Sequence, residues 1–243
     1  MLRSIICFSL LYIAQNIQSE CNFPTGNYIY QLNDPKSIQE ISIEVPKSSK
    51  YNKNFAKIIS SRSVNIPSDL KKNFKANLTI QYEFGSCTYK AKIRQHGDLR
   101  DHISFVDGKP SRSIKVSLES GNVFNAVKFR LLIPQTRNNL NEILGTVFLK
   151  ELGFIAPETF QVKTKINNVE SIMLFQEDIR KELLERNQRR EGPVFEGDET
   201  LLWSYNDFEL FELQHLALSR LTNPNWFLRG NSSKAITLAS FQK

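Results

Sequence analysis

The alternation of apolar and polar residues along the middle of the chain is typical of β-strands. Seven segments read as strands: 40–45, 76–84, 87–94, 113–118, 127–133, 159–166 and 170–175. Glycine or asparagine turn signals lie between several of them, at Gly85-Ser86, Gly121-Asn122 and Asn167-Asn168. Because strand side chains alternate between two faces, four of these segments, 87–94, 113–118, 127–133 and 159–166, each offer one apolar and one polar face. The pattern predicts a sheet that buries one face.

The polar faces of several strands are cationic. The basic residues on these faces are Lys90, Lys92, Arg94, Lys115, Lys128, Arg130, Lys163 and Lys165. Antiparallel sheets commonly have one solvated face, and this is the simpler interpretation. Like charges crowded on one face are costly unless an anion offsets them, which favours a phosphate-binding surface instead. Both interpretations stay open at this point.

Helical periodicity occurs at 140–152, before the last pair of strands. Its apolar stripe consists of Ile143, Leu144, Val147, Phe148 and Leu152. Asn139 with Glu142 predicts a capping box, and Gly153 predicts the C-terminal end. We expect this helix to cover the apolar strand faces. The predicted fold class is therefore α+β, a mainly antiparallel sheet with packed helices, followed by a helical segment.

The N-terminus has the pattern of a secretory signal. Arg3 precedes the apolar run 5–14, which is too short to span a bilayer comfortably. We predict a signal peptide over 1–19 and an exported mature protein, located in the periplasm, at the cell surface or in the medium. No transmembrane segment is expected once the signal is removed.

The rest of the chain divides into two predicted regions. Residues 20–200 form the α+β sheet domain, with its core at 76–178. Residues 201–243 read as a helical segment, including a predicted helix from Asn206 to Leu221. We expect this segment to be the start of a truncated second lobe.

Export changes the interpretation of the cysteines. Cys7 lies within the predicted signal, so the mature chain keeps Cys21 and Cys87. In an oxidising compartment such a pair commonly forms a disulfide, although two unrelated thiols are the alternative. No CxxC motif or Cys/His cluster is present, so the sequence does not favour a structural zinc site.

The chain is basic, with a formal net charge of +7. This balance suits anionic partners, such as a nucleotide, a phosphorylated sugar, an acidic polysaccharide or a membrane surface. The charge alone does not choose among them. We expect no nucleic-acid partner.

Two polar segments carry side chains suited to metal binding or acid–base chemistry. They are Asp98, Asp101 and His102 in one segment, and Glu196, Asp198 and Glu199 in the other. Neither set has a fixed ligand spacing, so solvated loops are the simpler interpretation. A metal-dependent hydrolase or nuclease that uses both sets is the third of our function hypotheses.

Five short stretches in the middle of the chain follow one another in a recognisable order. They are IRQHGD (93–98), KPSRSIKV (109–116), KFRLLIP (128–134), FLKELGF (148–154) and LFQEDI (174–179). Together they resemble the spore-coat-protein-H (CotH) family of atypical, secreted or surface-directed kinases. His96-Gly97-Asp98 stands where the family has Gly-Asn-Ser-Ser. The family's catalytic aspartates belong to a C-terminal lobe without a counterpart here, so catalytic residues stay unassigned.

The resemblance implies that the sheet is a kinase-like N-lobe that binds ATP with Mg. Its phosphate-binding residues would be Arg94, Arg112, Lys115 and Arg130, and Glu177 would lie at the hinge beside the base. The substrate would be a surface protein or a sugar.

Our leading function hypothesis is therefore an exported CotH-like protein that binds a nucleotide or another phosphate-bearing ligand on its cationic sheet face. As it stands, the chain is expected to be incomplete for phosphoryl transfer. The alternative is a non-catalytic exported module that binds acidic polysaccharide or phosphorylated envelope components.

Overall fold

The computed structural model describes residues 20–61, 63, 65–197 and 219–241. The predicted signal peptide and most of the helix predicted from residue 206 lie outside these ranges. The chain divides into two compact units, of which the first ends at Asp178 and the second begins at Ile179.

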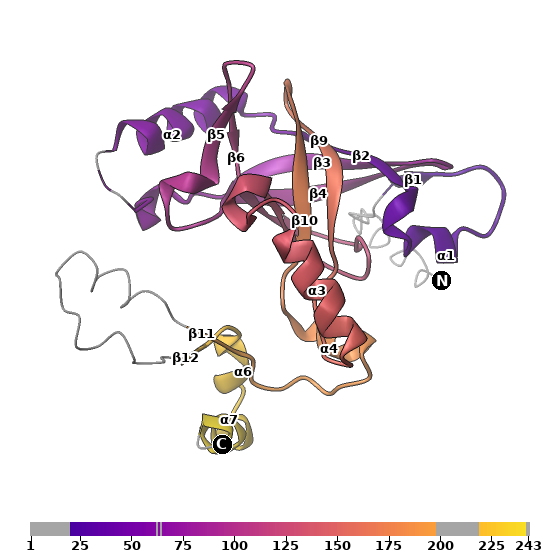
Figure 1. Cartoon of the computed structure of the whole chain (residues 1–243), viewed down its shortest axis with the longest axis vertical. Coiled ribbons are helices and arrows are strands. Elements are labelled where there is room, and N and C mark those ends of the chain that lie inside the picture. Colours follow the sequence, from indigo (N-terminus) through magenta and orange to yellow (C-terminus); the bar gives the residue numbers. More distant parts are fainter. Residues whose placement is uncertain (1–19, 62, 64, 198–218, 242–243) are drawn as a thin grey trace, which may run out of the picture. The chain divides into compact units, whose positions relative to one another are not determined.

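The first unit is built around a closed barrel of seven strands (Figure 1). The strands are β2 (Ile38–Glu44), β3 (Phe74–Tyr82), β4 (Gly85–Gln95), β7 (Ile114–Leu118), β8 (Lys128–Leu132), β9 (Thr159–Ile166) and β10 (Val169–Glu177). Their order is β4-β3-β2-β9-β10-β8-β7, and β7 pairs with β4 again, which closes the ring. All these pairs are antiparallel except β2 with β9, which is parallel.

Closure of the sheet overturns the predicted fold class. We expected an open, kinase N-lobe-like sheet whose apolar faces are covered by packed helices. Instead the strands curl until their apolar faces meet one another inside the barrel. The most deeply buried of these side chains, each at most 1% exposed, are Ile41, Ile43, Leu78, Ile80, Ala91, Ile93, Ile114, Val116, Phe129, Leu131, Met173 and Phe175. Amphipathic strands can bury their apolar faces under helices or inside a closed barrel, so the alternating pattern alone does not distinguish the two arrangements.

The predicted helix forms as α3 (Asn141–Glu151), but it does not cover the barrel. Thr146 is its one buried residue, and Leu144 and Phe148 in its apolar stripe are each 64% exposed. The predicted capping box is absent, because no side chain caps the first turn. Gly153, with φ +81°, follows the helix in the left-handed conformation that the sequence predicts.

The remaining elements of the first unit are short and lie outside the ring. They are β1 (Glu20–Asn22), α1 (Ile29–Leu32), α2 (Ser48–Ser60), the hairpin of β5 (Ile103–Val106) and β6 (Lys109–Arg112), and 3-10 turns at Pro35–Ser37, Ser68–Leu70, Arg100–His102 and Pro134–Arg137. α2 buries one face, which includes Tyr51, Phe55 and Ile58.

The second unit is smaller. Its described elements are α4 (Lys181–Arg186), β11 (Phe195–Gly197), β12 (Ser219–Leu221), α6 (Pro224–Phe227) and α7 (Asn231–Phe241). β11 and β12 pair as a short antiparallel ladder, and Arg220 forms an ion pair with Glu196 at 2.7 Å across it.

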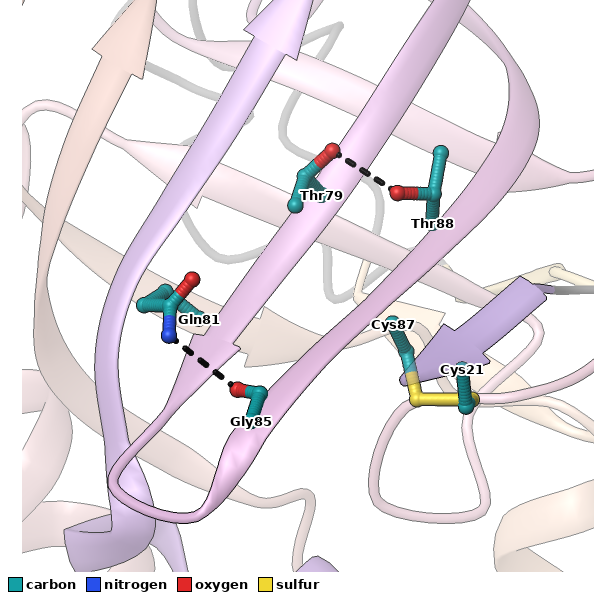
Figure 2. The surroundings of a disulfide bond; sticks show 6 residues. All are labelled: Cys21, Thr79, Gln81, Gly85, Cys87 and Thr88. Atoms are coloured by element: carbon teal, nitrogen blue, oxygen red, sulfur yellow. Dashed lines mark hydrogen bonds between the residues drawn. A yellow bond between two sulfur atoms is a disulfide. The ribbon is translucent and has the colours of Figure 1, made fainter. Parts of the chain in front are cut away.

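β1 pairs with β4 along the same edge that β7 uses further on. Cys21 of β1 lies directly opposite Cys87 of β4, and a disulfide joins them (Figure 2). This confirms the predicted disulfide. The link fixes the N-terminal strand to the outer end of the β3–β4 hairpin.

The β3–β4 hairpin turns two residues earlier than the sequence suggested. Glu83 and Phe84 form the turn, and Gly85 begins β4. Gly85 has φ +146°, and a Cβ there would lie 2.3 Å from the carbonyl oxygen of Asn22, so only glycine fits beside β1. Gln81 Nε2 donates a hydrogen bond to the Gly85 carbonyl at 3.2 Å (Figure 2).

Replacing both Cys21 and Cys87 with serine removes a link between positions 66 residues apart. For a loop of this length the chain-entropy model assigns a disulfide about 4 kcal/mol. We expect the free energy of unfolding, measured in urea, to fall by up to this amount. Dithiothreitol should lower the stability of the wild type toward that of the double variant and leave the variant unchanged. Equal stability of the two proteins under oxidising conditions would contradict the prediction.

Candidate functional site

Strand register brings three of the predicted phosphate-binding residues into one row. Arg94 of β4 lies opposite Lys115 of β7, and Lys115 lies opposite Arg130 of β8. Arg130 in turn lies opposite Gln176 of β10. Because their neighbours along each strand point into the barrel, the row is on its outside.

Two of these three cations share a counter-ion. Lys115 Nζ lies 2.7 Å from Asp178 Oδ2, and Arg130 Nη2 donates to Asp178 Oδ1 at 2.8 Å. The Asp178 side chain is only 3% exposed, so its charge is stable there because both cations neutralise it. The Arg94 side chain makes no hydrogen bond or ion pair with the rest of the described chain. In the predicted phosphate-binding row, Lys115 and Arg130 therefore form an ion-pair triad with Asp178, a carboxylate of the protein itself.

A chain of polar contacts continues from this triad. Arg130 Nη1 donates to Gln176 Oε1 at 3.3 Å, and Gln176 Nε2 donates to a carboxylate oxygen of Glu142 at the start of α3. Glu142 also lies 3.6 Å from Nε of Arg137, as an ion pair. We call these four residues, with Lys115 and Asp178, the Asp178 network. It ties β7, β8 and β10 to α3 and to the turn at Pro134–Arg137.

The half-buried imidazole of His96 lies beside the Asp178 network. Burial lowers its pKa, and the positive charges of Arg130, His102, Lys115 and Arg137 lower it further, to about 2. The ring is therefore neutral at ordinary pH, and its pKa is poorly suited to general acid–base catalysis. Its ring centroid lies 5.3 Å from that of His102, in an edge-to-face arrangement.

The acidic residues of the loop after β4 do not assemble a metal site. Asp98 forms an ion pair with Lys71. His102 is buried against Gly97, which has φ +89° and no room for a Cβ, since one would lie 1.8 Å from the ring. In the part of the chain that the structure describes, no group of three or more His, Cys, Asp or Glu side chains could hold a metal ion.

The third hypothesis also requires the acidic cluster near the end of the chain. Glu196 pairs with Arg220, and Asp198 and Glu199 lie outside the described residues. Nothing on these residues favours a metal-dependent hydrolase.

Arg112 and Glu177 lie elsewhere in the first unit and are not part of the row of Arg94, Lys115 and Arg130. Glu177 is 1% exposed, and its Oε2 accepts a hydrogen bond from the backbone N–H of Glu158 at 3.1 Å. Arg112 is buried on β6, and its guanidinium carbon lies 3.6 Å from the ring centroid of Tyr51. The structure thus brings together Arg94, Lys115 and Arg130, but not the other two predicted ligand-binding residues.

Beyond the row, the outside of neighbouring strands carries further lysines. Register places Lys75 of β3 opposite Lys92 of β4, and Ser117 of β7 lies opposite both Lys92 and Lys128 of β8. We call this surface the outer basic face; it consists of Lys75, Lys90, Lys92, Arg94 and Lys128. The local partners are weak, since Lys92 lies 3.5 Å from Glu119 and Lys90 donates to the neutral side chain of Asn77 at 2.8 Å.

Sequence reasoning missed two residues of these sites. Lys75 lies just before the predicted strand 76–84, but the alternation of Phe74, Ala76 and Leu78 places it on β3 with its side chain outward. Asp178 follows β10 directly, and no pattern distinguishes it from an ordinary loop carboxylate. The pairing of β10 with β8 brings its side chain to Lys115 and Arg130.

The sequence matches no known protein-family model and no curated protein. The resemblance to the CotH family therefore stays a prediction. Among the described helices, none is long and apolar enough to cross a membrane.

Changing Asp178 to asparagine leaves Lys115 and Arg130 without their shared counter-ion. Because the carboxylate is buried, we expect the free energy of unfolding to fall by about 3 kcal/mol. The matched control is Glu119→Gln, which removes the exposed ion pair with Lys92 and should cost less than about 1 kcal/mol. Urea denaturation of both variants checks this. Similar losses of unfolding free energy in the two variants would show that Asp178 is not needed to neutralise Lys115 and Arg130.

The lowered pKa of His96 predicts a pH dependence of stability. The folded-state pKa lies below the ordinary value of 6.5, so the unfolded chain takes up the proton more readily. Neutral His96 does not reduce the free energy of unfolding above pH 6.5. As the pH falls from 6.5 toward 2, the free energy of unfolding decreases by at most about 1.4 kcal/mol per pH unit because of this group. We expect the loss of stability between pH 6 and pH 5 to be smaller in His96→Gln by about 1 kcal/mol, measured in urea. If His96→Gln and the wild type lose the same stability between pH 6 and pH 5, the pKa of His96 is not lowered in the folded protein.

Proposed function

We propose that the protein is an exported, non-catalytic module that binds an acidic polymer on the outer basic face. The polymer is an acidic polysaccharide or a phosphate-bearing component of the cell envelope. The observation that carries this proposal is the accumulation of Lys75, Lys90, Lys92, Arg94 and Lys128 on the outside of adjacent strands, with Glu119 as the one carboxylate ion-paired to them among the described residues.

The electrostatics of this face favour a polymer over a single compact anion. The basic side chains are spread across β3, β4 and β8, with β7 between β4 and β8, so a chain of sulfate, carboxylate or phosphate groups would meet several at once. Each neutralised charge releases counter-ions and relieves repulsion between the lysines. Binding of this kind weakens steeply with added salt.

The expected nucleotide is less well supported at this place. Lys115 and Arg130, two of its predicted phosphate ligands, are paired with Asp178, which a nucleotide phosphate would have to displace. ATP with Mg was expected because the sheet was predicted to be a kinase-like N-lobe, and the sheet is instead a closed barrel. The disulfide suits an oxidising compartment, and we include export in the proposal on that ground.

The test compares two double variants with the same loss of charge. Lys90→Gln/Lys92→Gln removes the centre of the outer basic face. Lys36→Gln/Lys163→Gln removes exposed lysines from the Pro35–Ser37 turn and from β9. Affinities for dextran sulfate, for polyphosphate and for neutral dextran are measured at several salt concentrations.

We expect the Lys90/Lys92 variant to bind the two acidic polymers about tenfold more weakly, with a shallower dependence on salt. The control variant should retain nearly wild-type affinity, and neutral dextran should not bind any of the proteins. Equal weakening in both variants would show that only net charge matters, and absence of binding by the wild type at low salt would refute the proposed function.

A further inference from the structure

A cavity of about 230 Å³ lies between α2, the β5–β6 hairpin and the turn that joins β9 to β10. Ser48, Tyr51 and Phe55 line it from α2, Lys109 and Arg112 line it from β6, and Asn168 lines it from the turn. These elements are distant in sequence and meet only in the folded first unit. The cavity does not include the outer basic face or the Asp178 network.

Arg112 dominates the chemistry of this cavity. The residue is 4% exposed, and its guanidinium carbon lies 3.6 Å from the Tyr51 ring centroid and 4.8 Å from that of Phe55. Burial disfavours its charged form and lowers its pKa, and contact with Tyr51 only partly offsets this. Arginine is rarely buried to this degree without an anionic partner.

Arg112 has no anionic partner among the described residues. Nε donates to the Tyr51 hydroxyl at 2.9 Å and Nη2 donates to the Tyr51 carbonyl at 3.4 Å, and both acceptors are neutral. A guanidinium has five N–H bonds, so the other three, on Nη1 and Nη2, lack an acceptor in the described chain. The Tyr51 ring lies against the guanidinium at 3.6 Å, and these three N–H bonds remain to meet a further acceptor.

The rest of the lining adds positive potential and no acid. Lys109 Nζ reaches across the cavity rim to the Asn168 carbonyl at 3.4 Å. Ser48 belongs to the first turn of α2, a 13-residue helix that has no side-chain cap and no acidic residue in that turn. The free N–H groups of such a turn carry partial positive charge. No aspartate or glutamate is among the residues that line the cavity.

We propose that this cavity binds a small organic anion whose carboxylate or phosphate group pairs with the free edge of Arg112, while its apolar part packs against Tyr51, Phe55 and Ile166. Arginine recognises both kinds of oxyanion through paired N–H···O bonds. The cavity is smaller than a typical drug-sized site, which limits the ligand to a compact molecule. The proposal does not rest on polymer binding at the outer basic face.

The test uses three probes of similar shape, which are benzoate, phenyl phosphate and the neutral benzamide. They are titrated into ¹⁵N-labelled protein, and the NMR shifts of Arg112 Nε–H and the Asn168 side-chain amide are followed. We expect saturable shifts of both signals with at least one of the two anions, and none with benzamide. The tighter of the two anions identifies the oxyanion that the cavity prefers. Absence of saturable shifts with both anions up to 50 mM, or equal binding of benzamide, would overturn the proposal.

Two variants locate the site. Arg112→Met keeps an apolar side chain beside the Tyr51 and Phe55 rings and should reduce affinity for the anion at least tenfold, followed through the Asn168 amide. Ser48→Asp places a carboxylate at the cavity wall in a turn where a helix tolerates negative charge, so it should fold normally and compete with the ligand. Lys163→Gln, on the outside of β9, is the control and should bind as the wild type does. Retained affinity in folded Ser48→Asp and Arg112→Met would assign the shifts to another place.

Discussion

The pairing of β4 with β7 is the constraint on which the first unit depends. Ile93 lies opposite Val116 in this pair, and without it the seven strands would form an open sheet with a large exposed apolar face. With the pair formed, that face becomes the interior of a barrel and needs no layer of helices. α3 is consequently free to leave most of its apolar stripe exposed.

Closure also determines where the basic residues lie. Side chains that alternate with the core positions all point outward, so lysines from separate strands come together on one surface. Where a turn and α3 lie near this surface, Lys115 and Arg130 lose water and require Asp178 as a counter-ion. Where the surface is open, the lysines stay hydrated and accessible. One strand pattern thus produces both an internal ion-pair network and an exposed basic face.

The sequence predicts the individual strands well, because most of them alternate apolar and polar residues; β8 and β10 do so only in part, since Leu131-Leu132 and Ile172–Phe175 are consecutive apolar residues. It does not predict closure, because no local pattern shows that β4 pairs with β7 as well as with β3. The apolar stripe of the helix at 140–152 also suggested that a helix covers the apolar strand faces. The grouping of Arg94 with Lys115 and Arg130 was predictable from their shared outward phase. The partner of the last two was not, because Asp178 reaches them from the loop after β10. The Arg112 cavity likewise depends on α2 and the β9–β10 turn, which local patterns cannot place together.

The single parallel pair has a consequence for the order in which the chain can fold. β2 pairs with β9, so the segment around Ile43 meets its partner Ile166 only after the whole intervening chain is present. A chain synthesised from its N-terminus therefore holds one edge of β2 unpaired until the last hairpin of the first unit has followed. Pairings so distant in sequence are entropically costly and form slowly. The barrel therefore closes late, and the unpaired edge of β2 stays accessible to chaperones until then.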